Sequence, residues 1–294
     1  MVDLSSYAQN LNNKPVAVFG LGISGLSTIK ALLAAGIKVT AWDDKEENQK
    51  KAEGLGADIE DLTKIDLSDY AFLLLAPGVP YTFEPHDVVT NAQKYDLEII
   101  GDLELLHRAH HGLKTIGITG TNGKSTTTAL MTHVLNECGI KSAMGGNIGQ
   151  PVFDLDLTGI EVLVLEMSSY QLDLCPTFRP DMSVLLNITP DHLDRHGGMK
   201  HYIAAKARIL EGEGLAVIGT DDEYTQELFN QTFFNGHRQC IPVSVITEIP
   251  EGLFVTSHTL FENKGGENKK IITLDNLESL KGIHNYQKAA LVYV

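Results

Sequence analysis

Apolar runs and helical patterns alternate along the first hundred residues. Continuous apolar runs of strand length lie at Pro15–Gly20, Ile37–Trp42, Tyr70–Ala76 and Leu97–Ile100. Between the first two runs, Ser24–Ala35 has apolar residues at helical spacing and stops before a glycine. Buried strands separated by helices are typical of a parallel sheet covered on both faces. The pattern therefore predicts an N-terminal α/β domain with a Rossmann-like parallel sheet.

A second alternating pattern begins near Lys114. An apolar strand is expected at Thr115–Thr119, followed by a glycine turn and a helix from Lys124 to about Glu137. Further strands are expected at Glu161–Leu165, Met182–Leu186 and Leu215–Gly219, helices at Met199–Leu210 and Asp222–Phe229, and short antiparallel strands with a polar tip at Asn263–Lys269 between Ile241 and Leu274. A strand, a glycine turn and a helix in succession predict a P-loop NTPase-like α/β central domain.

The two patterns are separated by Gly101–Gly112, where the polar stretch HRAHHG carries no sheet pattern. We therefore expect one domain at residues 1–101 and a second at residues 102–294. The final residues, Asn285–Val294, become apolar and helical as the sequence stops, without a glycine cap or a polar tail. We expect such a helix to continue in a longer protein.

Composition and charge narrow the class of protein. The 294 residues are 43% hydrophobic and 21% charged, which is ordinary for globular domains. Basic and acidic residues number 23 and 38, and the net charge of −15 argues against general binding to nucleic acid or anionic membranes. Three widely spaced cysteines form no CxxC pair, so we expect neither a disulfide framework nor a cysteine zinc site. With no signal peptide and no run of membrane-spanning length, we expect a cytoplasmic protein.

The segment Gly117–Thr126 (GITGTNGKST) has the residue types of a phosphate-binding loop. Gly120 and Gly123 leave backbone N–H groups accessible, Lys124 can reach the β- and γ-phosphates, and a following hydroxyl can bind Mg²⁺. The segment departs slightly from the general spacing, which places a glycine where this chain has Ile118. We predict an ATP site formed by Gly120, Thr121, Asn122, Gly123, Lys124, Ser125 and Thr126.

Glu166 directly follows the predicted strand Glu161–Leu165. A carboxylate at the carboxyl end of a strand, in a sheet that also carries a phosphate loop, can reach the metal of a bound nucleotide. We therefore expect Glu166 to be a metal ligand.

A polar cluster, Asp191–His196 (DHLDRH), lies beyond the strand Met182–Leu186. Histidine, aspartate and arginine this close together suit metal and phosphate binding. His192 and His196 also have the spacing of a zinc pair on a helix, but Pro190 and the glycines after His196 favour a loop instead.

A second glycine motif follows the first predicted strand. Gly20, Gly22 and Gly25 form a GxGxxG pattern that opens a helix, and Asp43 ends the next strand. This is the dinucleotide-binding pattern in its usual context. Physically it specifies a tight turn whose N–H groups bind a diphosphate, so NAD and other nucleotide diphosphates both remain open.

Five segments, in this order and spacing, resemble the Mur ligases of peptidoglycan precursor synthesis: GITGTNGKST, EMSSYQL, NITPDHLDRH, AAKARI and GIHN. The phosphate loop is shared with folylpolyglutamate synthases and does not discriminate. SSYQL after Glu166 is similar to the branch of the family that adds D-glutamate, and so is GLGISGLS together with APGVP at Ala76–Pro80. The resemblance extends over essentially the whole chain.

The resemblance implies a ligase reaction. ATP would phosphorylate the terminal carboxylate of UDP-N-acetylmuramoyl-L-alanine, and the amine of D-glutamate would attack the acyl phosphate to form an amide. The implied partners are these small molecules, with ATP and two Mg²⁺ ions as cofactors. The expected protein is a cytoplasmic monomer that neither binds nucleic acid nor inserts into a membrane.

The resemblance also implies roles for residues of the second domain. Lys124 would contact the β- and γ-phosphates, and Asn285 would lie at the ATP site. Lys206 matches the lysine that carries a carbamate, whose anionic oxygens can bind a metal as an ammonium cannot. Spacing alone would place Lys206 on an exposed face of the helix Met199–Leu210. The implied metal ligands are Ser125, Glu166, His192 and carbamylated Lys206, with a second Mg²⁺ at His192.

For the first domain the resemblance implies UDP rather than NAD, as does the absence of any hydride-transfer constellation. Asp43 lies where the family holds uracil, but a NAD site would use the same residue for ribose. The motif alone therefore does not distinguish UDP from NAD. The implied UDP-substrate residues are Gly22, Ile23, Ser24, Asp44, Lys45 and Asn147.

Two departures from the family pattern stand out. In its GxHNxxN segment, Lys288 replaces the second asparagine, on the adenine side of the site. The family's third domain, which supplies groups for D-glutamate and closes over ATP, does not follow in this sequence. We therefore expect the chain to bind UDP-N-acetylmuramoyl-L-alanine and ATP without efficient ligation.

Three alternatives stay open. A sister ligase would act on another UDP-muramoyl substrate or on folate. An NAD-dependent oxidoreductase would use the GxGxxG turn but leave the phosphate loop unexplained. A non-catalytic nucleotide-binding remnant of a ligase would keep both loops without the reaction.

Overall fold

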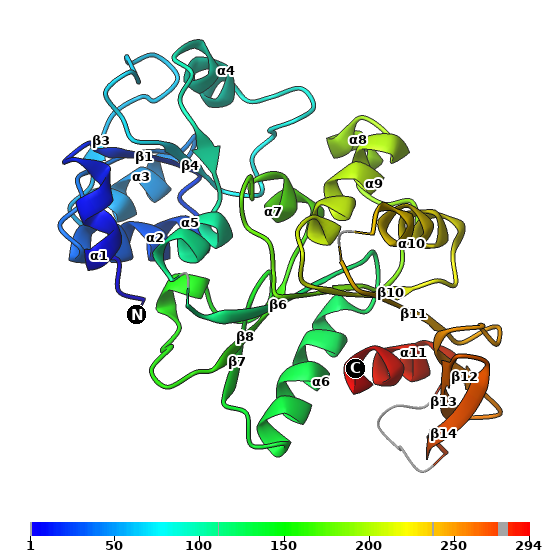
Figure 1. Ribbon diagram of the computed structural model, residues 1–294. Helices are drawn as coiled ribbons and strands as arrows, with labels where there is room; N and C mark the ends of the chain where they lie inside the picture. The colour runs from blue at the N-terminus through cyan, green and yellow to red at the C-terminus, as the bar shows by residue number, and fades with distance from the viewer. Residues whose placement is uncertain (1, 111, 237, 276–281) are drawn as a thin grey trace.

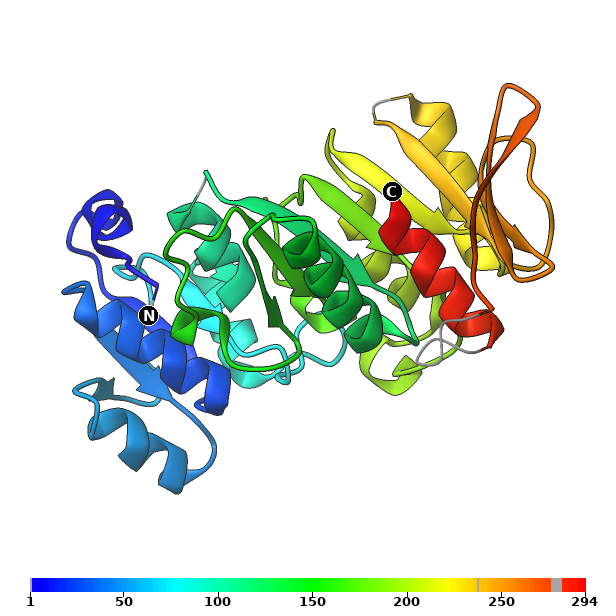
Figure 2. The same ribbon diagram turned by 90° about the horizontal axis from the view of Figure 1, so that it is seen from below.

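The computed structural model describes residues 2–110, 112–236, 238–275 and 282–294, and these residues form two β-sheets (Figure 1). The first sheet lies at one end of an elongated molecule and strands β12–β14 lie at the other (Figure 2). None of the helices in the described residues combines the length and apolar character needed to cross a bilayer.

The first sheet is parallel throughout, with strand order β3-β2-β1-β4-β5. Its order reverses between β1 and β4, and ligands of such sheets bind beyond the carboxyl ends of the strands at this reversal. The segments that follow β1 and β4 therefore flank a natural binding crevice. The strands are β1 (Val16–Phe19), β2 (Val39–Trp42), β3 (Asp58–Ile59), β4 (Leu73–Leu75) and β5 (Ile99–Ile100).

Helices cover the first sheet because its central strands are buried on both faces, with every residue of β1 buried. The helices of this region are α1 (Ser5–Ala8), η1 (Gln9–Leu11), α2 (Ile23–Ala34), α3 (Glu46–Glu53) and α4 (Asp87–Lys94). The predicted strands are confirmed, although β4 and β5 are shorter than their apolar runs.

The second sheet is mixed, with strand order β14-β13-β12-β11-β10-β9-β6-β8-β7. Its strands from β7 to β12 are parallel, and β13 and β14 pair antiparallel. The strands are β6 (Lys114–Thr119), β7 (Ser142–Gly146), β8 (Val162–Glu166), β9 (Met182–Leu185), β10 (Leu215–Gly219), β11 (Cys240–Ser244), β12 (Gly252–Thr256), β13 (Thr259–Lys264) and β14 (Glu267–Thr273).

Helices lie on both faces of the second sheet (Figure 1). Helices α6 and α11 pack side by side on one face, and α9 and α10 lie on the other. The helices of this region are α5 (Asp102–Ala109), α6 (Lys124–Glu137), η2 (Val152–Asp154), α7 (Ser169–Asp173), α8 (Leu193–His196), α9 (Met199–Ala207), η3 (Arg208–Leu210), α10 (Glu223–Asn235) and α11 (Ile283–Tyr293).

One predicted strand has the wrong direction. The segment after Ile241 was expected to begin an antiparallel group, but β11 runs parallel to both β10 and β12. Helix α10 carries the chain back across the sheet before β11 starts, and such a crossover produces parallel neighbours. The expected antiparallel pairing is found for β12 with β13 and for β13 with β14, and the β13–β14 hairpin has the expected polar tip.

The polar boundary segment forms helix α5, although His111 lies outside the described residues. Glu104 of α5 is fully buried, and its carboxylate accepts hydrogen bonds from Arg108 Nε and Phe178 N, both at 2.8 Å. Gly101 N donates to Leu174 O at 2.9 Å. A buried carboxylate satisfied in this way attaches α5 to the segment after α7, so the joint between the two sheets is packed.

Candidate functional site

The glycine-rich loop between β6 and α6 has a backbone that needs its glycines. Gly123 has φ +87°, a conformation that other residues rarely adopt. A Cβ at Gly120 would lie 2.8 Å from Leu186 Cβ, too close for a real contact. Helix α6 then begins with no side-chain cap. The N–H groups of its first turn are left for an anionic ligand.

The segment after β9 holds this loop in place. Thr121 N and Asn122 N donate to the backbone oxygen and to Oδ1 of Asn187, each at 2.9 Å. Asn187 Nδ2 returns a bond to Asn122 O at 3.1 Å, and Thr121 Oγ1 bonds to Thr189 O at 3.1 Å. The sequence analysis assigned no role to Asn187. A polar residue directly after a buried strand was the signal that could have identified it.

Two lysines converge on one carbonyl of the loop. Lys124 Nζ lies 3.0 Å and Lys206 Nζ 2.7 Å from Gly120 O, and Lys206 is only 2% exposed. Among the described residues neither ammonium forms an ion pair with a carboxylate. Burial, together with the charge of Lys124, lowers the pKa of Lys206 to about 7, and burial also lowers the pKa of Lys124. The exposed position that spacing suggested for Lys206 is wrong.

Helix α9 supplies a second contact to the loop. Tyr202 lies one helical turn before Lys206, so both side chains project from the same face. The hydroxyl of Tyr202 is 3.0 Å from Thr121 Oγ1, and Lys206 Nζ lies 4.8 Å from the centre of the Tyr202 ring. Sequence reasoning did not identify Tyr202.

Glu166 ends strand β8 beside the loop and is 2% exposed. Its Oε1 accepts a hydrogen bond from Asn147 Nδ2 at 3.1 Å, whereas Oε2 is buried without a hydrogen-bond partner. A bare buried carboxylate oxygen is costly unless a cation or a donor completes it. Glu166 therefore fits the role of a metal ligand.

His192 precedes helix α8, a single turn where a loop was expected. The ring of His192 is half exposed, 3.4 Å from Asp191, with its centre 5.3 Å from that of Tyr170. His196 is buried, and its Nε2 lies 2.9 Å from Ser169 Oγ. Burial, more than nearby positive charge, lowers the pKa of His196 to about 4. The two histidines occupy different environments, so nothing in their geometry favours a zinc pair.

The predicted metal ligands surround the loop but supply few anionic oxygens. Ser125 is exposed at the start of α6, and Glu166 is the buried carboxylate nearby. Within the described ranges, no three histidine, cysteine, aspartate or glutamate side chains come together as a metal site. Unmodified Lys206 offers a cation where a metal would need an anion.

The glycine turn after β1 is tight on one side and open on the other. A side chain at Gly25 would run into Gly20 O, whereas a Cβ at Gly22 would meet nothing within 4 Å. Helix α2 starts at Ile23 without a side-chain cap, and Ile23 is 80% exposed. The N–H groups at Ile23 and Ser24 are therefore placed to meet an anion.

Asp43 completes this turn instead of facing outward. Its Oδ2 accepts from Leu21 N at 2.6 Å and its Oδ1 from Lys45 N at 2.9 Å, and it is 8% exposed. A carboxylate engaged in this way is poorly placed to bind the ribose of NAD. Neighbouring Asp44 is exposed, with Oδ2 3.3 Å from His86 Nε2.

The two regions meet at the carboxyl ends of their strands. Arg195 Nη2 donates to Gly78 O at 2.8 Å, and its guanidinium lies 5.2 Å from the ring centre of Tyr170. A Cβ at Gly197 would run into Phe83, so these two residues are in close contact. The segment after β4 therefore touches the segment after β9, which places the carboxyl ends of the two sheets next to each other.

Asn285 lies in the first turn of α11, beside the phosphate loop. Its Oδ1 accepts a hydrogen bond from Lys288 Nζ at 2.9 Å. The side chain of Lys288 runs against Gly123, where a Cβ would lie 3.0 Å from Lys288 Cε.

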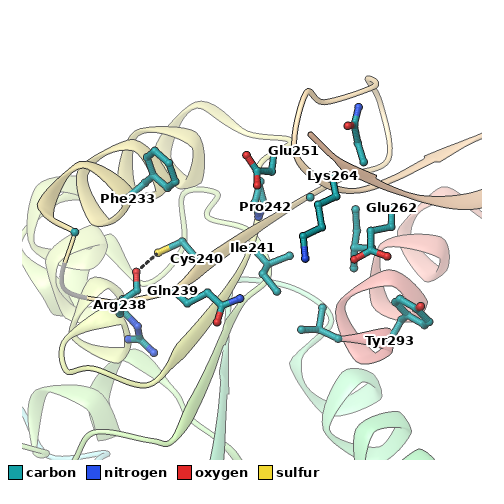
Figure 3. Close-up of a pocket in the computed structure, with 15 residues that line it drawn as sticks. Phe233, Arg238, Gln239, Cys240, Ile241, Pro242, Glu251, Glu262, Lys264 and Tyr293 are labelled. Atoms are coloured by element: carbon teal, nitrogen blue, oxygen red, sulfur yellow. Dashed lines mark hydrogen bonds between the residues drawn. The ribbon is translucent and has the colours of Figure 1, made fainter. Parts of the chain in front are cut away.

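A cavity with a volume of about 670 Å³ lies elsewhere in the described chain (Figure 3). It is lined from the amino ends of β11 and β12, including Gln239, Cys240 and Leu253, and from the ends of α10 and α11, including Phe233 and Tyr293. The phosphate loop lies at the opposite, carboxyl edge of this sheet. The charged groups described above, and not this cavity, therefore identify the functional site.

Comparison with known proteins identifies both regions. The model of the Mur ligase middle domain matches residues 118–287. The model of the MurD-like N-terminal domain of Mur ligases matches residues 14–101.

Two curated relatives from different bacteria have the same enzyme name. The UDP-N-acetylmuramoylalanine–D-glutamate ligase of Caulobacter sp. (strain K31) is 45% identical over 97% of this chain and 63% of its own length. The ligase of the same name from Chelativorans sp. (strain BNC1) is 45% identical over 96% of this chain and 62% of its own length. The chain thus spans less than two thirds of these relatives.

Solved structures share the fold. The UDP-N-acetylmuramate:L-alanyl-γ-D-glutamyl-meso-diaminopimelate ligase of Neisseria meningitides superimposes with a TM-score of 0.57 at 20% identity, over 95% of this chain and 91% of that one. The UDP-N-acetylmuramate-alanine ligase of Thermotoga maritima gives a TM-score of 0.51 at 19% identity, over 95% of this chain and 64% of that one.

Proposed function

Because the chain belongs to the Mur ligase family, we propose that it binds UDP-N-acetylmuramoyl-L-alanine and ATP and activates the substrate carboxylate for ligation to D-glutamate. The observation that carries this proposal is the convergence of Lys124, Lys206 and Glu166 on one phosphate loop. Residues 1–101 would form the UDP-substrate domain and residues 102–294 the ATP domain.

The first turn would hold the diphosphate of the UDP-sugar. Its open side at Gly22 and the N–H groups at Ile23 and Ser24 suit an anion that approaches closely. The inward position of Asp43 supports UDP over NAD. Asp44 and Lys45 would lie at the uracil, and Asn147 would approach the sugar while it orients Glu166.

The second loop would hold ATP. Gly120–Ser125 would surround the β- and γ-phosphates, and Asn285 would lie on the adenine side. Magnesium, when bound, would neutralise phosphate charge and hold the oxygens of the reacting groups in line. The residues that would hold two ions are Ser125, Glu166, His192 and Lys206 as a carbamate.

Carbamylation of Lys206 would complete the anionic donor set. The neutral amine would form an N–C bond to CO₂ while one C=O electron pair moves to oxygen and the amine loses a proton to water. A pKa of about 7 keeps much of the amine neutral at physiological pH, and the side chain forms no ion pair with any described residue. The product is a carboxylate-like donor near Glu166.

The reaction would proceed in two steps. A carboxylate oxygen of the alanine forms a bond to the γ-phosphorus while the bond to the β-phosphate oxygen breaks, releasing ADP. The D-glutamate nitrogen then bonds to the acyl carbon, phosphate leaves with the electron pair, and the amine loses a proton. Lys124 reduces the repulsion between the carboxylate and the polyphosphate, which is the main barrier to the first step.

We propose that the chain works as a monomer in the cytoplasm. The Arg195–Gly78 contact brings the two regions together within one chain, which supports a site that needs no residue from a second copy. The net charge of −15 supports small-molecule substrates over a polyanionic partner.

Thermal unfolding with three ligands in parallel tests the proposal. A ligand that binds only the folded chain raises the unfolding midpoint by mass action. We expect UDP-N-acetylmuramoyl-L-alanine and Mg·ATP each to raise it, and NAD to leave it unchanged. Stabilisation by NAD alone would refute the assignment of the first domain.

A further inference from the structure

Lys288 is a basic residue beside the phosphate loop, and it has no role in the proposed reaction. We infer that Lys288 binds the nucleotide's diphosphate, acting as a second phosphate cation beside Lys124 and favouring nucleotides that carry a β-phosphate. This inference rests on the proposed ATP site.

The position of Lys288 follows from the packing of α11 on α6 (Figure 1). Lys288 lies on the face of α11 that meets the start of α6. A Cβ at Gly123 would lie 3.0 Å from Lys288 Cε and 4.0 Å from Nζ. Gly123 is the last residue before α6, where phosphate loops present backbone N–H groups to a β-phosphate. The ammonium of Lys288 is thus held at the phosphate end of the site.

The hydrogen bond that Lys288 forms in the free chain is weak enough to be replaced by one to a ligand. Its Nζ donates to the neutral amide oxygen of Asn285 at 2.9 Å, and within the described ranges it forms no ion pair. The bond to the amide has a charge on the ammonium only, whereas a phosphate oxygen would add a full opposite charge. A phosphate oxygen would therefore attract the ammonium more than the amide does, while Lys288 stays half buried and restrained.

The charge of Lys288 distinguishes this chain from the pattern it otherwise follows. The Mur ligase pattern has asparagine at this position, and an amide cannot neutralise a phosphate. With Lys124 turned toward Gly120 O and Lys206 proposed to become a carbamate, Lys288 is the second positive charge at the loop. The family pattern places this position on the adenine side, but the Lys288 side chain runs against Gly123 at the phosphate end, so its charge discriminates by phosphate number.

Nucleotide binding to charge-removing and charge-preserving variants tests the inference. Dissociation constants for Mg·ADP and AMP would be measured by calorimetry for the wild type and for Lys288→Asn, Lys288→Gln and Lys288→Arg. Lys270→Ala, which removes an exposed charge on strand β14, is the matched control. Unfolding midpoints without nucleotide would show that each variant is folded.

We expect Lys288→Asn and Lys288→Gln to weaken Mg·ADP binding about tenfold, which is the loss of one charge-assisted hydrogen bond. Lys288→Arg should stay within about threefold of the wild type, and Lys270→Ala within about twofold, since neither removes the local charge. AMP binding should be unchanged. If Lys288→Asn bound Mg·ADP as tightly as the wild type, or lost affinity equally for ADP and AMP, this inference would be overturned. The proposed ATP site would not be affected. A wild-type chain that binds no Mg·ADP would overturn the proposed ATP site and this inference with it.

Discussion

The two glycine turns of this protein look alike in sequence but balance their charges in opposite ways. In the first, the carboxylate of Asp43 is engaged by the N–H groups of Leu21 and Lys45. In the second, two lysines share the carbonyl of Gly120, while the nearby Glu166 keeps a buried oxygen without a partner. The first turn is complete without a ligand, whereas the second holds charges that only a ligand can balance.

The difference corresponds to two kinds of task. A turn that docks a diphosphate needs only N–H groups and a fixed backbone, which an internal carboxylate such as Asp43 can hold in shape. A site that moves a phosphoryl group needs charges in position before the substrates arrive, because reorganising them during the reaction would raise the barrier. Burying Lys206 and Glu166 near the loop provides this preorganisation at a cost in stability.

The largest effect should come from Lys124→Ala. If the second loop carries the chemistry and the first only docks substrate, acyl-phosphate formation should fall by about 10³-fold, as when a main transition-state donor is removed. The affinity for UDP-N-acetylmuramoyl-L-alanine should stay within about twofold of the wild-type value. ADP release measures the first quantity and calorimetry the second. An equal loss of both would contradict the separation of the two sites.

The stability of the folded chain should depend on pH through Asp102, which lies at the start of α5, at the joint between the two regions. Burial raises the pKa of Asp102 to about 6, above its unfolded value of 3.8. Between these two pH values the folded chain holds a proton on Asp102 that the unfolded chain has released. The free energy of unfolding therefore falls as pH rises through this interval and stays lower above it. A shift of this size corresponds to about 3 kcal/mol.

Asp102→Asn should remove that dependence. The variant should match the wild type near pH 4 and be more stable by up to about 3 kcal/mol at pH 7.5, since its amide oxygen can still accept from Leu103 N. Denaturant unfolding at the two pH values measures the difference. A variant that is less stable than the wild type at pH 7.5 would show that the carboxylate of Asp102 stabilises the joint.

Lys206→Ala should lower acyl-phosphate formation by about 10²-fold, because the second loop loses an anionic donor. Added short carboxylic acids should restore part of the activity, and ¹³CO₂ should label the wild-type chain but not the variant at this position. The label should decline as pH falls below about 7, where the amine of Lys206 becomes protonated. Full activity in the variant would remove Lys206 from the site.

Gly22→Asp should give the smallest effect. In contrast to Lys124→Ala, it should impair the first turn and leave the second loop unaffected. Gly22 has open space where a side chain would extend, so the substitution adds a negative charge without a steric clash. We expect about tenfold weaker binding of the UDP-sugar by repulsion, and unchanged Mg·ATP binding. Gly22→Ala is the control that adds a methyl group without the charge, and it should weaken binding less than Gly22→Asp does. Equal weakening by both variants would show that space, not charge, governs this turn.

Much of the fold could be predicted from periodicity. The apolar runs at β1, β2, β6, β8, β9 and β10 and the helix from Lys124 to Glu137 appear where the pattern placed them. Local periodicity failed where partners decide the outcome. The direction of β11 depends on α10 crossing the sheet, and the polar boundary segment became α5 because Glu104 finds its partners some 70 positions later, at Thr177 and Phe178.

The sequence by itself determined which chemical groups are present and their order along the chain: two glycine turns, a lysine and hydroxyl for phosphate, and a carboxylate at a strand end. These follow from local backbone needs that only a few residue types meet. The tertiary structure alone decided that Lys206 is buried and turned onto Gly120, that Asp43 is engaged by its own turn, and that Arg195 joins the segment after β9 to the segment after β4. Burial and charge are properties of surroundings assembled from distant segments, so no local pattern records them.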